Sequence, residues 1–184
     1  MGSPGAITGT VTSADGTRVV FDRRGAGPVI VLVHGASADR LALAEVARLL
    51  SPWFTAVTYE RRGWAGLDRE IEDLAAVIGA TGGRAGVFGG SSGAVLALEA
   101  TVRLPAIICL VLWEPPAPLA TAAAVRRPAL VLNSGRSPAR TRRTGSALAR
   151  AIPAAVHRVL PGQTPDVTPQ ALAPELLEFF TRHQ

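Results

Sequence analysis

Apolar residues along this chain follow two kinds of pattern. The first is a short unbroken aliphatic run bounded by Gly, Pro or polar residues, which is typical of a strand buried on both faces of a parallel sheet. Apolar runs of this kind cover residues 29–33, 85–88, 106–113 and 129–133, and residues 54–59 and 156–160 also read as strands. Ahead of them, β-branched runs at residues 8–12 and 17–23 flank an Asp15-Gly16 pair, which predicts an antiparallel hairpin.

The second pattern is helical spacing, in which apolar residues recur every three or four positions. It predicts helices over residues 39–50, 68–78, 94–102, 119–126, 146–152 and 171–180. Two strands followed by strand and helix in alternation indicate an α/β fold. We expect a doubly wound, mostly parallel eight-stranded sheet with helices on both faces and a ligand crevice at the carboxyl ends of the strands. A single domain over residues 1–184 accommodates all of it.

The charge of the chain changes this picture little. The net charge is +5, and all 19 basic residues are arginines scattered along the chain without interleaved aromatics. This pattern argues against nucleic-acid binding, and the absence of lysine excludes Schiff-base and P-loop chemistry. The only cysteine, Cys109, lies in an apolar run and is expected to be a buried side chain.

Targeting signals are not visible in the sequence. The first residues carry no basic region followed by an apolar stretch, and no apolar segment is long enough to cross a bilayer. We therefore expect no membrane association and a cytoplasmic location.

The candidate chemistry begins at residues 89–93, which read G-G-S-S-G and place Ser91 between a predicted strand and a predicted helix. Glycines on both sides allow a tight turn that lifts the serine hydroxyl clear of the sheet. The Ser92 N–H and the positive end of the following helix then face a developing negative charge.

Three motifs in this order resemble the α/β-hydrolase superfamily. Residues 29–36 (V-I-V-L-V-H-G-A) are similar to its third strand and oxyanion loop, residues 59–66 (Y-E-R-R-G-W-A-G) to its D-x-R-G-x-G loop, and residues 89–93 to its nucleophile elbow. The resemblance implies Ser91 as nucleophile and an oxyanion hole formed by the N–H groups of Ala36 and Ser92. It also implies that the substrate contacts a wider set of side chains, expected to be His34, Ser37, Trp64 and Trp113. No cofactor or metal is expected.

The rest of the catalytic triad does not match. The loop after the seventh strand, residues 133–138, contains no carboxylate, and Pro165 stands where the superfamily carries its histidine. Glu114, directly after the sixth strand, and Asp166 are the candidate proton acceptors. His157 and His183 are expected away from the crevice.

A second departure is the short connection of residues 114–128, which leaves no room for a cap domain. An open crevice accommodates a small-molecule or carrier-bound substrate, and a homodimer is a further expectation. Three functions stay open: a non-hydrolytic enzyme (cyclase, lyase, dehydratase or isomerase type) acting on a carbonyl compound, a serine esterase or thioesterase with an unusual base, and an inactive binding module.

Overall fold

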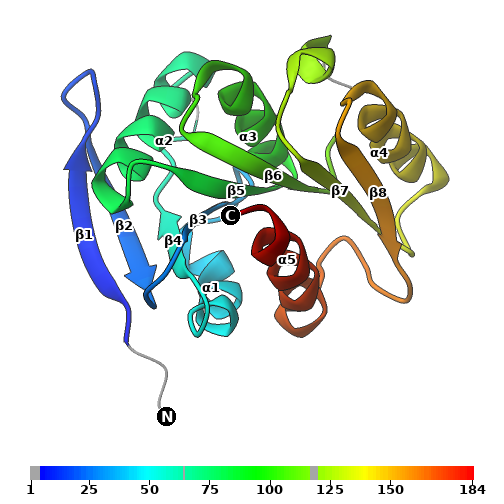
Figure 1. The fold of residues 1–184 in the computed structure, drawn as a ribbon, viewed down its shortest axis with the longest axis horizontal. Coiled ribbons are helices and arrows are strands. Elements are labelled where there is room, and N and C mark those ends of the chain that lie inside the picture. The colour runs from blue at the N-terminus through cyan, green and yellow to red at the C-terminus, as the bar shows by residue number, and fades with distance from the viewer. Residues whose placement is uncertain (1–4, 64, 117–119) are drawn as a thin grey trace.

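The computed structural model describes residues 5–63, 65–116 and 120–184. Its centre is one eight-stranded sheet with the strand order β1-β2-β4-β3-β5-β6-β7-β8 (Figure 1). The strands are β1 (Ile7–Thr12), β2 (Arg18–Arg24), β3 (Val29–Val33), β4 (Thr55–Tyr59), β5 (Ala85–Gly90), β6 (Ile107–Trp113), β7 (Ala129–Ser134) and β8 (Ala155–Leu160). The hairpin of β1 and β2 joins β4 antiparallel, and every other pairing is parallel.

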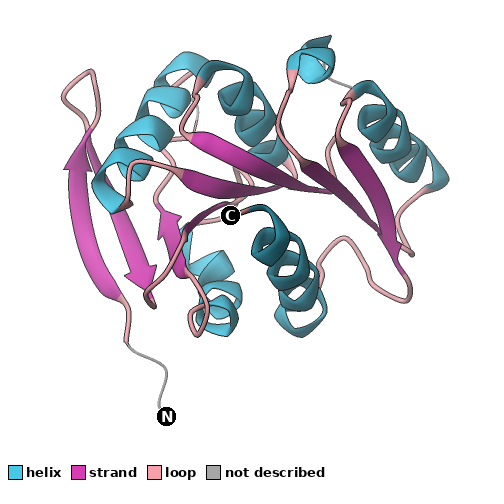
Figure 2. Ribbon diagram, in the orientation of Figure 1, coloured by secondary structure: helices cyan, strands magenta, loops and turns pink. Residues whose placement is uncertain are grey.

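Helices cover both faces of the sheet (Figure 2). One face carries α2 (Leu67–Thr81), α3 (Ser92–Arg103) and α4 (Ala139–Ala151), and the other carries α1 (Ala44–Leu50) and α5 (Pro169–His183). Two 3-10 turns, η1 (Arg40–Leu43) and η2 (Ala120–Ala124), complete the described elements. The doubly wound architecture predicted from the sequence is confirmed.

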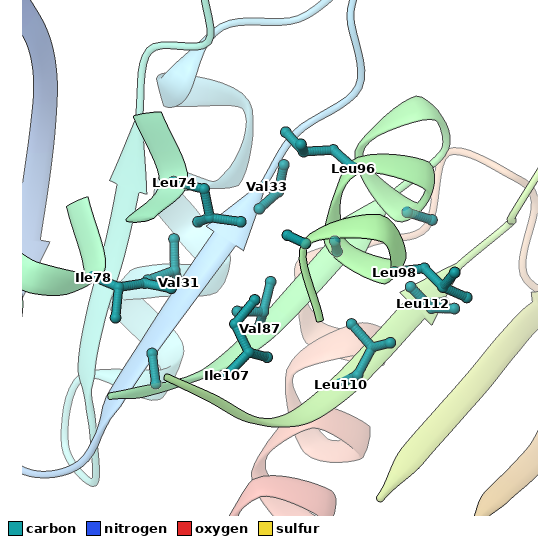
Figure 3. Close-up of a cluster of buried hydrophobic side chains, with 14 of the residues drawn as sticks. Val31, Val33, Leu74, Ile78, Val87, Leu96, Leu98, Ile107, Leu110 and Leu112 are labelled. Atoms are coloured by element: carbon teal, nitrogen blue, oxygen red, sulfur yellow. The ribbon is translucent and has the colours of Figure 1, made fainter. Parts of the chain in front are cut away.

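Alternation within the buried strands builds a core on each face. Val31 and Val33 of β3 point toward α2 and α3, where they join Leu74 (Figure 3). Ile30 and Leu32 of the same strand face α1 and α5. Because both faces are covered, the central strands β3 to β7 are buried at almost every position, which is why the sequence shows apolar runs there.

Two of the predicted helices differ most from the structure. The helix predicted over residues 39–50 is divided: Asp39 accepts a hydrogen bond from the Leu41 N–H and begins η1, and α1 follows at Ala44. Leu41, in the first of these two elements, is 58% exposed and does not join the core. α4 begins seven residues before the predicted Ser146, because the arginines of its first turns hid the helical pattern.

The connection between β6 and β7 contains only η2 among its described residues, so no cap domain is evident there. Its helix was predicted over residues 119–126, of which Leu119 lies outside the described residues. The far end of the chain closes the opposite face of the sheet: Phe180 of α5 is fully buried, and the Gln184 amide donates to the Val29 carbonyl oxygen at 3.3 Å. No helix in the described ranges is both long and apolar enough to cross a bilayer.

Candidate active site

Ser91 lies at the sharp turn between β5 and α3, with φ 54° and ψ −121°. A residue other than glycine is strained in this backbone conformation. The turn also requires glycine at its two ends: a Cβ on Gly89 would lie 2.4 Å from the Gly93 carbonyl oxygen, and one on Gly93 would lie 2.5 Å from the Val33 carbonyl oxygen. We call residues 89–93 the serine turn.

The serine turn opens on a crevice of about 500 Å³ at the carboxyl ends of the strands. Six predicted site residues line it together, namely His34, Ser37, Ser91, Trp113, Glu114 and Asp166. Its apolar wall includes Val46, Phe88 and Leu172, which the sequence analysis did not assign to the site. These three residues belong to the core between the sheet and the α1/α5 layer, so the core itself continues into the crevice. Trp64 lies outside the described residues.

The Ser91 hydroxyl is exposed to the crevice and has no hydrogen-bond partner within the described ranges. Its backbone is fixed, because the Ser91 N–H donates to the Trp113 carbonyl oxygen at 2.8 Å. The hydroxyl is therefore well placed but not activated by a neighbouring base.

The two N–H groups predicted to form the oxyanion hole, those of Ala36 and Ser92, differ in their hydrogen bonding. The Ala36 N–H donates to the Ser92 side-chain Oγ at 2.7 Å. This contact occupies the Ala36 donor with an oxygen of the chain itself, at the distance that a substrate oxygen would take. The Ser92 N–H lies at the start of α3, where backbone N–H groups lack helical partners.

Arg61 supports both loops and was not singled out from the sequence. Its Nη1 donates to the His34 carbonyl oxygen at 2.7 Å and lies 3.4 Å from Ser92 Oγ. The same guanidinium forms an ion pair with Glu70 at 2.6 Å, and both side chains are buried. The available signal was its place in the R-G loop at residues 61–63.

Glu114 follows β6 directly and has φ 49°; with Ser91 it is one of two described non-glycine residues with positive φ. Its Oε1 accepts from the Ser134 N–H at 2.5 Å and from the Ser137 hydroxyl at 2.7 Å. Oε2 has no partner among the described residues, and the side chain is 9% exposed. Both serines belong to the loop of residues 133–138, which has no carboxylate of its own. The two serines were the available signal that this loop binds a carboxylate from another strand end.

Asp166 lies on the loop between β8 and α5, and its carboxylate makes no hydrogen bond within the described part of the chain. It does not cap α5, whose N-cap residue is Thr168. The neighbouring Pro165 is held in the crevice wall by Trp113, whose indole N–H donates to the Pro165 carbonyl oxygen at 2.9 Å.

Of the three histidines, only His34 lines the crevice. Its Nδ1 lies 2.7 Å from the Gly35 carbonyl oxygen, and its buried Nε2 has no partner in the described ranges. His157 is in the middle of β8 and bonds the Asn133 side-chain oxygen at 2.9 Å. His183 ends α5 and lies against Phe179. Cys109 is buried, as predicted, and burial raises the pKa of its thiol to about 12.

The described residues contain no cluster of three or more His, Cys, Asp or Glu side chains that could hold a metal ion. The candidate site consists instead of one strained serine, two carboxylates and one imidazole around an open crevice. Such an arrangement can bind a polar ligand and exchange a proton with it.

Comparison with known proteins agrees with this architecture. An alpha/beta hydrolase from Sphaerobacter thermophilus is 32% identical, the match covers 94% of this chain and 100% of that one, and the TM-score is 0.86. A dienelactone hydrolase from Anabaena variabilis superposes with the same TM-score over 98% of both chains at 15% identity, which shows a shared fold alone.

A curated relative is the uncharacterized hydrolase YraK of Bacillus subtilis, 39% identical over 104 residues. That match covers 49% of this chain and 38% of the relative's length. The family model described as "Alpha/beta hydrolase family" matches residues 30–183. On this match the chain belongs to the alpha/beta hydrolase family.

Proposed function

We propose that this chain is an enzyme that binds a carbonyl-containing small molecule in the crevice and acts on it without forming an acyl-enzyme. The reaction is of the cyclase, lyase, dehydratase or isomerase type. The observation that carries the proposal is that the Ser91 hydroxyl, on its strained turn, has no basic partner among the described residues, while Glu114 and Asp166 line the same crevice.

In this mechanism the Ser91 hydroxyl donates a hydrogen bond to the carbonyl oxygen of the substrate. The Ser92 N–H adds a second donor at the start of α3, where the helix dipole also favours negative charge. Together they stabilise an enolate, the anion that forms when a proton leaves the carbon next to the carbonyl.

A carboxylate accepts that proton. Glu114 is held by two hydrogen bonds to one oxygen, which leaves Oε2 for the substrate. Asp166 is the second acceptor, from the loop after β8 that also carries Pro165. Positioned acid–base groups of this kind contribute about 10²–10⁴-fold to a rate.

Exchange of carbon-bound protons in D₂O tests the proposal. Incubation with a panel of ketones and thioesters, followed by NMR, should show loss of the signal of the hydrogen next to the carbonyl for the compounds that bind. Glu114→Gln or Asp166→Asn should abolish the exchange, and Ser91→Ala should slow it. Exchange that is absent throughout the panel, or unaffected by all three variants, contradicts the proposal.

The second candidate is a serine esterase or thioesterase with an unusual base. The retained strain at Ser91 favours it, since a strained serine turn is typical of a nucleophile, and so do the hydrolases among the relatives. Stoichiometric labelling of the wild type by a fluorophosphonate, lost in Ser91→Ala, would support this candidate over the first.

A further inference from the structure

Carboxylates on this chain are almost all paired with arginines. Asp and Glu together number 14, all within the described residues, and 11 of them form an ion pair with an arginine. Of the remaining three, Asp39 accepts the Leu41 N–H at the start of η1. The other two are Glu114 and Asp166, and both line the crevice.

Glu114 and Asp166 do not lack arginine partners because arginine is scarce in this part of the sequence. Residues 115–165 contain eight arginines and no carboxylate, and only Arg158 among these eight forms an ion pair. No arginine of the described ranges lines the crevice. The fold therefore keeps a negatively charged crevice in a chain whose net charge is +5.

Glu114 is buried and has no positively charged partner among the described residues. The residue is 9% exposed, and its only described partners are two neutral donors on Oε1. Burying a carboxylate without a compensating charge is unfavourable. A site that retains such a group is arranged for a positive partner that arrives with the ligand.

One more polar side chain at the crevice has an unpaired nitrogen. His34 Nδ1 donates to the Gly35 carbonyl oxygen at 2.7 Å. His34 is 4% exposed and lines the crevice, and its Nε2 has no described partner. Phe88 and Trp113 also line the crevice, and aromatic side chains are residues that can stabilise a cation.

We infer that the crevice selects an organic cation, so that the substrate is a carbonyl compound bearing an ammonium group. The ammonium lies close to both Glu114 and Asp166. It donates to a free oxygen of one carboxylate, and the other carboxylate accepts the proton from the substrate carbon. This inference deepens the proposed function, because it names the substrate class of the same crevice. A metal ion fits less well, because no cluster of three or more potential ligands exists in the described part of the chain.

Equilibrium binding tests the inference without requiring turnover. Benzylammonium, benzyl alcohol and benzoate have similar size and differ in charge, and NMR titration of the Trp113 indole N–H reports on the crevice wall. We expect benzylammonium to bind at least tenfold more tightly than benzyl alcohol, benzoate to bind most weakly, and added NaCl to weaken benzylammonium alone.

Two isosteric variants locate the charge. Glu114→Gln and Asp166→Asn should each weaken benzylammonium at least fivefold and leave benzyl alcohol within twofold. Glu45→Gln, which neutralises an exposed carboxylate of α1 paired with Arg48, is the matched control and should change neither. Equal binding of the three probes, tightest binding of benzoate, or Mg²⁺ binding without any ammonium preference overturns the inference.

The two proposals fail separately. Ser91→Ala removes the proposed carbonyl donor and leaves both carboxylates, so it should keep the preference for benzylammonium. Cation preference without proton exchange refutes the proposed reaction alone. Proton exchange on neutral carbonyl compounds without cation preference refutes this inference alone.

Discussion

The Ser91 N–H donates to the carbonyl oxygen of Trp113, 2.8 Å away, and so joins the ends of the neighbouring strands β5 and β6. Ser91 and Glu114, the residues that follow these two strand ends, share a positive φ. Two strained residues side by side in one crevice indicate that the fold sets both side chains at a cost in stability.

That cost is measurable at Ser91. Since glycine adopts this conformation freely, Ser91→Gly should raise the free energy of unfolding by about 1 kcal/mol, the strain of an L-residue less the added chain entropy of glycine. Urea denaturation gives the value, and Ala76→Gly in the middle of α2 should lose about 1 kcal/mol instead. Equal losses for both variants would mean that Ser91 is not strained.

Ser92→Ala removes the oxygen that occupies the Ala36 N–H. The freed donor can then reach the substrate, so we expect proton exchange to become about fivefold faster, the equivalent of one hydrogen bond of about 1 kcal/mol. Stability should fall by a similar amount, because the contact joins two loops. Ser92→Thr keeps the hydroxyl and should resemble the wild type in both measurements. Slower proton exchange in Ser92→Ala would contradict the idea that Ser92 Oγ competes with the substrate for the Ala36 N–H.

Pro165→His places an imidazole on the crevice loop that also carries Asp166. If the crevice keeps the geometry of a hydrolase, 4-nitrophenyl acetate hydrolysis should rise about 10²–10⁴-fold over the wild type. Pro165→Ala separates the effect of losing proline from that of gaining a base. Activity that persists in Pro165→His combined with Ser91→Ala would place the hydrolysis elsewhere.

Arg61→Met leaves the buried Glu70 carboxylate without its cation, and we expect a loss of about 3–5 kcal/mol in unfolding free energy. Adding Glu70→Leu should restore most of it, because a well-packed apolar pair replaces a buried ion pair at little cost. Chemical denaturation of the single and double variants measures both values. A double variant as unstable as Arg61→Met would show that the contact to the His34 carbonyl oxygen, not the ion pair, dominates.

His157 provides a pH dependence outside the crevice. Burial, and secondly the charge of Arg150, lower the pKa of His157 below its ordinary value of 6.5. The unfolded chain therefore binds the proton more readily, so stability present above pH 6.5 is lost as the pH falls through and below that value. Thermal denaturation from pH 7.5 to 5 should show a steeper decline for the wild type than for His157→Gln, and parallel curves would refute the assignment.

Strands and the serine turn could be predicted because their causes are local. Unbroken apolar runs predict β3 and β6 to within a residue. Gly89 and Gly93 are required because a Cβ on either residue would collide with a backbone carbonyl oxygen. The start of α4 was missed, because its first turns contact solvent and give no apolar period.

Contacts between side chains from different strand ends could not be predicted from the sequence. The bond from Ala36 to Ser92 joins residues 56 positions apart, and the serines that hold Glu114 come from another strand end. Likewise, nothing in the composition of an arginine-rich chain indicates which three carboxylates lack an arginine partner. The predicted homodimer stays a prediction.

The hydrogen bond from Gln184 to Val29 connects residues 155 positions apart and fastens α5 beneath the third strand. During synthesis on the ribosome, the sheet surface under α5 stays uncovered until α5 itself has emerged. Ile30, Leu32 and Phe88 are open to nonspecific association until then, so a nascent chain that still lacks α5 is especially vulnerable to aggregation.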